Sequence, residues 1–154
     1  MPGNALGGDV EAATFVGTEE ARIGQEWLFA LPLPYNKSDR ELTITGANVV
    51  DVPSGLTVRG VSAHALKDTG GEMTLLARIG ATDPVAKELE AAKDLSKKPN
   101  RIKRKSLSSV YYVARIKVIG PVASEVEKCR FTYRQANKQY AQVVGCRLQI
   151  QLKG

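Results

Sequence analysis

Residues 129–146 read CRFTYRQANKQYAQVVGC, two strand-like runs of alternating character around a polar centre. If Asn137 and Lys138 form a two-residue loop, Cys129 faces Cys146 directly across the two strands. The pair then occupies a non-hydrogen-bonded position of the ladder, where Cα atoms lie about 4.5 Å apart. A disulfide accepts that separation. The stretch therefore predicts an antiparallel hairpin closed by a Cys129–Cys146 disulfide, provided that no bulge shifts the register.

These two cysteines, the only ones in the chain, also indicate a cellular compartment. Two buried free thiols are the alternative, whereas two cysteines and one distant histidine cannot supply four zinc ligands. A structural disulfide indicates an oxidising compartment. Residues 1–3, Met-Pro-Gly, begin no secretory signal, because a basic start and an apolar core are missing. We therefore expect a secreted or membrane-anchored protein whose native signal is absent here; a cytosolic protein with free thiols is the alternative.

Outward from the hairpin, alternation of apolar and polar residues recurs along the chain. Turn signals such as Pro53-Ser54-Gly55 and Thr69-Gly70-Gly71 separate the runs. We count seven or eight short strands, a pattern typical of an antiparallel, Ig-like β-sandwich. Before the hairpin strands at 128–135 and 139–151, the predicted strands are residues 10–16, 25–33, 41–52, 56–63, 72–80 and 107–119.

The chain of 154 residues is long enough for one domain with its own core. Glycine-rich residues 1–9 predict a flexible tether, and residues 10–154 predict a single sandwich domain. The strand series has one long interruption, an insert at residues 82–106. Asp83-Pro84 begins a helical periodicity, so we expect one short helix at about residues 83–95, followed by a basic loop. No apolar run reaches the roughly 20 residues of a transmembrane helix.

Positive charge is concentrated in this insert. The chain has 22 Lys and Arg against 16 Asp and Glu, a formal net charge of +6. Residues 97–105, KKPNRIKRK, hold six basic residues and no acid, so the remainder is neutral at 16 against 16. Such a segment attracts nucleic acid, an anionic lipid surface or an anionic wall polymer, and a solvated loop is the alternative. The six are Lys97, Lys98, Arg101, Lys103, Arg104 and Lys105.

Aromatic residues add a second binding hypothesis. Tyr111, Arg115 and Lys117 share one face of the predicted strand 107–119, which makes Tyr111 a candidate surface aromatic. Single-strand nucleic-acid binders combine such aromatics with cations. A half-exposed strand face without a ligand is the alternative. Trp27 and Phe29 are expected in the core rather than on a ligand platform.

No enzyme signature occurs in the sequence. The phosphate-binding GxxxxGK[ST], the HExxH and the GxSxG patterns are all missing. His64 has no neighbour at a spacing that marks an oriented nucleophile or acid, so we expect an edge or turn histidine. The sequence predicts no catalytic residue, no metal and no cofactor. An enzyme of another type would need carboxylates held in a cleft.

The chain resembles a group of exported or anchored β-sandwich proteins from actinobacteria, of the Streptomyces type. The likeness covers residues 25–150 and rests on turn and core motifs, so it transfers no catalytic residue. It implies an exported Ig-like sandwich. Trp27 precedes both cysteines, whereas antibody domains place a tryptophan between them. The matching motifs are W-x-x-x-L-P-L-P-x-N at 27–36, P-x-G-L-x-V at 53–58, T-G-G at 69–71, Tyr111-Tyr112 and the late cysteine pair.

Together these features predict a non-catalytic extracytoplasmic binding or interaction module at the bacterial cell envelope. Its partner would be an anionic polymer, a lipid surface or an envelope protein, contacted by the basic segment or by an exposed strand edge. The alternative is a nucleic-acid-binding domain that uses residues 97–105 together with Tyr111. Oxidised cysteines favour the first hypothesis, and reduced cysteines favour the second.

Overall fold

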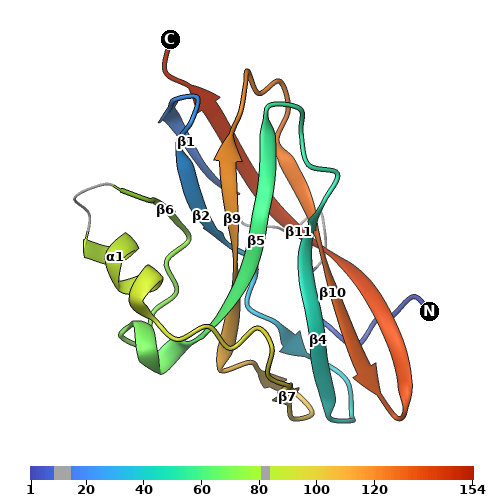
Figure 1. The fold of residues 1–154 in the computed structure, drawn as a ribbon. Coiled ribbons are helices and arrows are strands. Elements are labelled where there is room, and N and C mark those ends of the chain that lie inside the picture. The colour runs from blue at the N-terminus through green and yellow to red at the C-terminus, as the bar shows by residue number, and fades with distance from the viewer. Residues whose placement is uncertain (9–14, 81–83) are drawn as a thin grey trace.

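The long C-terminal hairpin lies inside a five-stranded sheet in the computed structural model, which describes residues 1–8, 15–80 and 84–154 (Figure 1). The pairs in this sheet are antiparallel, except that the first strand of the chain runs parallel to the last. Across the sheet, the order is β1 (Phe15–Ala21), β11 (Lys138–Leu152), β10 (Val126–Gln135), β4 (Leu42–Val50) and β7 (Asn100–Ile102).

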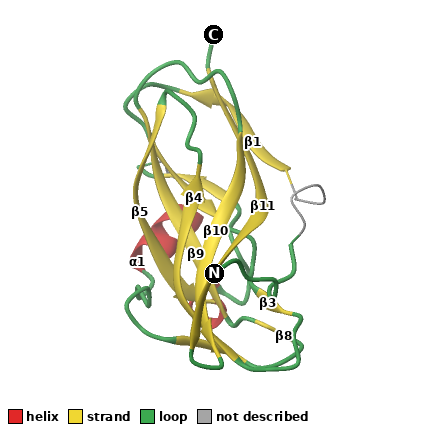
Figure 2. Ribbon diagram, turned by 90° about the vertical axis from the view of Figure 1, so that its right-hand side faces the viewer, coloured by secondary structure: helices red, strands yellow, loops and turns green. Residues whose placement is uncertain are grey.

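A four-stranded antiparallel sheet faces the first one, and a two-stranded sheet lies at one end (Figure 2). The predicted mainly β class is therefore confirmed, with one mixed sheet. No helix in the described residues is long and apolar enough to cross a membrane. The remaining elements are β5 (Leu56–Ala65), β9 (Val110–Val118), β2 (Glu26–Ala30) and β6 (Leu76–Arg78) in the second sheet, the pair β3 (Tyr35–Asn36) and β8 (Ser106–Leu107), the 3-10 helix η2 (Leu66–Thr69) and the helix α1 (Pro84–Ala91).

The main core lies between the two larger sheets. Trp27 and Phe29 are buried in it, as predicted. Tyr112 of β9 meets Phe131 of β10 edge to face, with ring centroids 5.7 Å apart. The alternation predicted for the strand at 107–119 is confirmed, because Tyr112 and every second residue after it are buried in this core. Alternation along a strand assigns side chains to a face without knowledge of the partner strand.

In the predicted strand at 41–52, alternation places Leu42, Ile44, Val50 and Val52 on one face, and this phase holds only in the first half of the strand. Ile44 points into the core, but the register between β4 and β10 shifts beside Thr45. A bulge adds one residue to one strand and reverses the facing of the residues beyond it. Val49 rather than Val50 therefore enters the core, and Val52 is 36% exposed.

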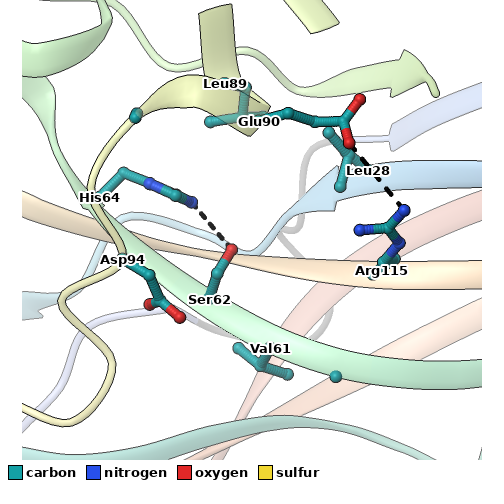
Figure 3. Close-up of a pocket in the computed structure, with 10 residues that line it drawn as sticks. Leu28, Val61, Ser62, His64, Leu89, Glu90, Asp94 and Arg115 are labelled. Carbon is teal, nitrogen blue, oxygen red and sulfur yellow. Dashed lines mark hydrogen bonds and ion pairs between the residues drawn. The ribbon is translucent and has the colours of Figure 1, made fainter. Parts of the chain in front are cut away.

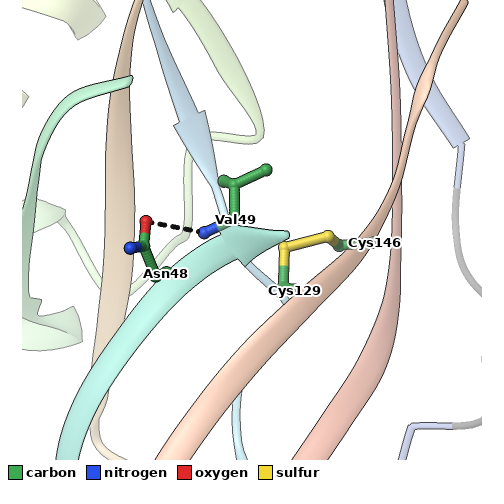
Figure 4. Close-up of a disulfide and its surroundings, with 4 residues drawn as sticks. All are labelled: Asn48, Val49, Cys129 and Cys146. Carbon is green, nitrogen blue, oxygen red and sulfur yellow. Dashed lines mark hydrogen bonds between the residues drawn. A yellow bond between two sulfur atoms is a disulfide. The ribbon is translucent and has the colours of Figure 1, made fainter. Parts of the chain in front are cut away.

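The disulfide between Cys129 and Cys146 is confirmed, with Cα atoms 5.8 Å apart, but the predicted register is wrong (Figure 4). The turn consists of Ala136 and Asn137, one residue earlier than predicted, with φ angles of 50° and 65°. Cys129 therefore faces Val144, and Cys146 is its diagonal neighbour. The displaced turn shifts each pair by two positions. Because two is the side-chain period of a strand, both cysteines still point into the core.

The first turn residue is alanine, which explains why the sequence does not predict the position of the turn. Left-handed backbone angles disfavour alanine and suit glycine or asparagine, so Ala136 is a poor signal for a two-residue hairpin turn. The observed register pairs Tyr133 with Tyr140, whose rings stack with centroids 5.4 Å apart. We infer that strand pairing and tyrosine stacking stabilise this register by more than the left-handed backbone conformation of Ala136 costs.

Residues 1–8, expected to be part of a tether, contact the five-stranded sheet instead. Ala5 and Leu6 are 4% and 1% exposed, and the Gly3 amide donates to the Ala141 carbonyl at 2.9 Å. A Cβ at Gly3 would lie 2.1 Å from the Tyr133 hydroxyl oxygen, so this approach requires glycine. Residues 9–14 lie outside the described part, and of the first predicted strand, 10–16, only its last two residues are described, in β1.

The insert at 82–106 differs from the predicted helix and loop. Helix α1 begins at Pro84 and ends at Ala91, earlier than residue 95, and residues 81–83 lie outside the described part. The expected basic loop forms β7, a turn and β8 instead. Ile102 pairs with Leu42 of β4 and is 2% exposed. Backbone pairing and burial of this one isoleucine therefore order a segment that its like charges would otherwise extend.

Helix α1 packs on the outer face of the four-stranded sheet (Figure 1). Its Leu89 joins Leu28 and Val113 in a second, smaller core. Tyr111 belongs to this core and is fully buried, so its predicted place on the surface is wrong. The Tyr111 hydroxyl donates to Thr69 Oγ1 at 2.9 Å, and burial raises the pKa of the tyrosine. Alternation placed Tyr111 on the correct face but could not show that a helix covers it.

We expect the double variant Cys129→Ala, Cys146→Ala to lose about 3 kcal/mol of unfolding free energy. The crosslink closes a loop with a sequence separation of 17, which restricts the unfolded chain. Urea unfolding followed by circular dichroism measures the difference. A reductant should lower the midpoint of the wild type to that of the variant and leave the variant unchanged. An unchanged wild-type midpoint would contradict the prediction.

Candidate functional site

Basic residues from three separate segments meet at one end of the sandwich, the end where β7 lies in Figure 1. Thr43 of β4 pairs with Arg134 of β10 on one side and with Arg101 of β7 on the other. Directly opposed residues project to the same face, so both guanidinium groups flank one row of the sheet. We call the following eight exposed residues the basic end: Lys37, Arg40, Arg101, Lys103, Arg104, Lys105, Arg134 and Lys138.

One buried side chain ties the turns of the basic end together. Asn36 is 0% exposed, and its Nδ2 donates to the carbonyl oxygens of Arg40 at 2.7 Å, Ile102 at 3.0 Å and Lys103 at 3.2 Å. Its Oδ1 accepts from the amide and the hydroxyl of Ser38, at 3.0 and 2.6 Å. The turn after β3 and the turn after β7 are therefore held in one arrangement.

The hairpin tip is attached to the same turns. Gln135 Nε2 donates to Ser38 Oγ at 2.8 Å and to the Arg40 carbonyl at 3.1 Å. Gln135 pairs with Lys138 across the tip, which brings that cation to the same end. Hydrogen bonds of this kind fix the backbone on which the cations stand, while their long side chains stay in water.

The electrostatic balance at this end is strongly positive. Asp39 is the one acid within segments 37–40, 101–105 and 134–138, and Glu41 directly follows the first segment, so eight cations less these two carboxylates leave the same +6 that the whole chain carries. Lys105 Nζ is 3.6 Å from Asp39 Oδ1, the one ion pair that the described residues make with the basic end. Its two side chains are 59% and 86% exposed, and exposed pairs of this kind contribute little.

The nine binding residues predicted from the sequence do not form one surface. Four of them, Arg101 and Lys103 to Lys105, belong to the basic end. Lys97 and Lys98 are exposed on the connection from α1, beside the point where the Leu95 amide donates to the Ala63 carbonyl at 2.7 Å. They precede β7 in the chain and are not part of the basic end.

The other three, Tyr111, Arg115 and Lys117, lie on the outer face of the opposite sheet. Arg115 Nε donates to Glu26 Oε2, and this hydrogen bond lowers the pKa of the Glu26 carboxyl. Arg115 Nη2 is 3.9 Å from Glu90 Oε2 of α1. The charge of Arg115 is therefore engaged within the protein, and the predicted cluster of tyrosine and cations is not assembled.

Sequence reasoning missed Lys37, Arg40, Arg134 and Lys138. A partial signal was present, because Arg130, Thr132 and Arg134 alternate with buried residues along β10. It marked a polar face but could not name the strand beside it. Strand pairing brings that face next to Arg101, and the chain order does not reveal this.

A second polar cluster lines a pocket of about 330 Å³ between α1 and β5 (Figure 3). His64 Nε2 is 2.8 Å from Ser62 Oγ, and His64 Nδ1 is 3.1 Å from the Lys93 carbonyl oxygen. A carbonyl only accepts, so Nδ1 carries the proton and Nε2 accepts from the serine hydroxyl. Burial lowers the pKa of His64, which favours the neutral ring.

This pair has the geometry of a nucleophile and its base, which the sequence did not indicate. Acyl transfer also needs donors that stabilise an oxyanion. Glu90 and Asp94 line the pocket, and its one cation, Arg115, is already paired with carboxylates. Asp94 Oδ1 accepts from the Ala63 amide at 3.0 Å. The contacts attach the segment after α1 to β5, and the carboxylates disfavour an oxyanion beside Ser62.

Comparisons with known proteins do not identify a family for this chain. No family model matches the sequence, and no curated protein matches it. Among solved structures, a match is "Structure of Vibrio cholerae VesB protease", with a TM-score of 0.40 and 12% identity. The match covers 94% of this chain and 32% of that chain, and a likeness this low carries no argument. Within the described residues, no group of three or more His, Cys, Asp or Glu is placed to hold a metal ion.

The lowered pKa of His64 predicts a pH dependence of stability. Its folded pKa lies below the ordinary 6.5, so the unfolded chain binds more protons in this range. The contribution of neutral His64 to the free energy of unfolding is complete above the unfolded pKa. It is lost as the pH falls through 6.5 toward the folded pKa. Urea unfolding at several pH values between about 7.5 and about 5 gives the free energy of unfolding as a function of pH. We expect this free energy to fall less steeply with decreasing pH for His64→Gln than for the wild type. Equal slopes would contradict the prediction.

We expect Asn36→Asp to destabilise the chain by about 3 kcal/mol. The substitution removes the donors that three carbonyl oxygens share and buries a carboxylate among them. Asn48→Asp makes the same charge change at an exposed position and is the control. Urea unfolding at neutral pH measures the unfolding free energy of both variants. Similar small losses of unfolding free energy in both would show that Asn36 does not hold the turns together.

Proposed function

We propose that the chain is an extracytoplasmic binding module of the bacterial cell envelope that engages an anionic surface through its basic end. The observation that carries the proposal is the convergence of eight exposed cations from segments 37–40, 101–105 and 134–138. A field of one sign at one end of a molecule attracts and orients an anionic partner. No chemical step is required for that role.

The disulfide supports a place outside the cytoplasm. Cys129 and Cys146 are 0% and 2% exposed, and within the described residues no cysteine is free. Structural disulfides form and persist in oxidising compartments such as the bacterial periplasm or the cell surface. We infer secretion or anchoring from this chemistry, and the envelope then supplies the anionic surface.

We further propose that the sandwich is Ig-like. The chain passes from β2 in one sheet to β4 in the other, returns through β5 and β9, and ends in β10 and β11. A first strand parallel to the last, with β2 and β9 adjacent in the opposite sheet, supports this topology. The disulfide departs from antibody domains, because it joins neighbouring strands of one sheet. In Ig-like sandwiches the loops at the two ends carry binding sites, and the basic end is one of these ends.

Nucleic acid is the second candidate partner, since its phosphates would contact the same cations. Two observations weaken it. Tyr111, the aromatic residue that was expected to stack on bases, is fully buried. The disulfide favours the envelope over the cytoplasm.

A matched pair of charge variants tests the proposal. The first, Arg101→Gln, Lys103→Gln, Arg104→Gln and Arg134→Gln, removes half of the basic end. The control changes four exposed cations elsewhere, Arg22→Gln, Arg59→Gln, Lys67→Gln and Lys87→Gln, so the net charge is the same. Binding to purified anionic wall polymer, anionic vesicles and duplex DNA is measured at about 50 and about 200 mM salt.

We expect the wild type and the control to bind an envelope polyanion with a steep loss at the higher salt. The basic-end variant should bind at least about tenfold more weakly, because several phosphate contacts are removed together. Equal losses in both variants would show that only net charge matters. Tightest binding to DNA would favour the nucleic-acid alternative, and no binding to any of the three would overturn both.

A further inference from the structure

The two-stranded sheet β3–β8 exposes two apolar side chains at the basic end. Tyr35 and Leu107 are a directly opposed pair, and such pairs project to the same face. Tyr35 is 36% exposed and Leu107 is 62% exposed, although their strand neighbours Asn36 and Ser106 turn toward the protein. Figure 2 shows β3 and β8 at the end of the sandwich opposite the C-terminus.

This apolar pair is rigidly supported. Behind it, the N-terminal segment packs so closely that a Cβ at Gly7 would come within 3.3 Å of the Tyr35 ring. The Gly7 amide donates to the Tyr35 carbonyl at 2.9 Å. Asn36, the next residue, is the buried tie described above. The backbone of β3, with which Leu107 pairs, is therefore fixed by the N-terminal segment and by Asn36.

Cations flank the pair at the adjoining ends of the two strands. Lys37 directly follows β3, and Lys105, a turn residue with a φ of 52°, directly precedes β8. Lys105 Nζ donates to the Lys37 carbonyl at 2.7 Å, so the two lysines stay together, and Arg104 is the next residue in the turn. Asp39, which forms an ion pair with Lys105, is the acidic residue beside these cations.

This combination discriminates between anionic partners. A soluble polyanion uses the cations but leaves Leu107 in water. The interface of an anionic membrane offers phosphates for the cations and, a few ångströms deeper, an apolar boundary for leucine. Tyrosine is favoured at the headgroup level, because its ring is apolar and its hydroxyl is polar.

We propose that the basic end docks on an anionic phospholipid membrane, with Leu107 and Tyr35 inserted at the headgroup boundary. The inference rests on the proposed function and names its anionic surface as a lipid bilayer. Lys37, Arg104 and Lys105 contact lipid phosphates around the inserted pair. The contact is peripheral and reversible, because two side chains bury little apolar area.

The test compares two serine variants of the full chain. Leu107→Ser removes the inserted side chain, and Ile119→Ser is the control at a loop of the other end, where the isoleucine is 56% exposed. Sedimentation with vesicles of phosphatidylglycerol and phosphatidylcholine measures membrane affinity. Binding to soluble wall polymer measures the electrostatic part alone. We expect Leu107→Ser to weaken vesicle binding about tenfold, to leave polymer binding unchanged, and Ile119→Ser to change neither.

A fluorescence variant reports insertion directly. Trp27, the single tryptophan of the chain, is 9% exposed, so its emission forms a constant background. Leu107→Trp should shift its emission to shorter wavelength when phosphatidylglycerol vesicles are added, and not with phosphatidylcholine vesicles alone.

The outcomes separate this inference from the proposed function. If Leu107→Ser binds vesicles as well as the wild type and Leu107→Trp shows no shift, insertion is overturned while electrostatic binding stands. If vesicles fail to bind but the wall polymer binds in a salt-dependent way, the partner is the polymer and the inference is overturned alone. If neither binds, the proposed function fails with it.

Discussion

The pairing register of the β10–β11 hairpin is the constraint on which the rest of the sandwich depends. β10 and β11 lie inside their sheet, with β4 beside one and β1 beside the other. A slip by one residue would turn Cys129, Phe131 and Tyr133 to solvent and bring Arg134 into the core. The disulfide and the stacked tyrosines hold the register at both ends of the hairpin. Through β4, the same register sets Arg134 beside Arg101.

The insert between β6 and β9 serves both layers of the molecule. Its helix covers the outer face of the four-stranded sheet and buries Tyr111, and the contacts of His64 and Asp94 attach the segment that follows. Its last part adds β7 to the other sheet and β8 to the end of the sandwich. A segment that interrupts the strand series is therefore what closes one core and builds the basic end.

A structural role accounts for only part of the basic charge. β7 is an edge strand, and charged side chains on edges prevent pairing with other chains. That explains Arg101. It does not explain Lys37 and Arg40, which follow β3, or Lys138, the first residue of β11. Hydrogen bonds of Asn36 and Gln135 bring these segments to the same end of the sandwich. Nor does edge protection explain why Leu107 stays exposed among these cations. These residues are the reason to assign the end a binding role.

The sequence predicts the mainly β class, the disulfide and the core face of β9, because alternation is a local property with a period of two. It does not predict the bulge that reverses the second half of β4. The predicted face of each hairpin side chain is correct although the predicted turn is not, because an error of two pairing positions leaves every side chain on the same face. Tertiary structure alone decided what covers each face and which strands are neighbours. Tyr111 is buried because a helix that is distant in sequence packs on it. Arg134 and Lys37 join the basic run only through strand pairing and one buried amide. Those contacts are long-range, and no local pattern records them.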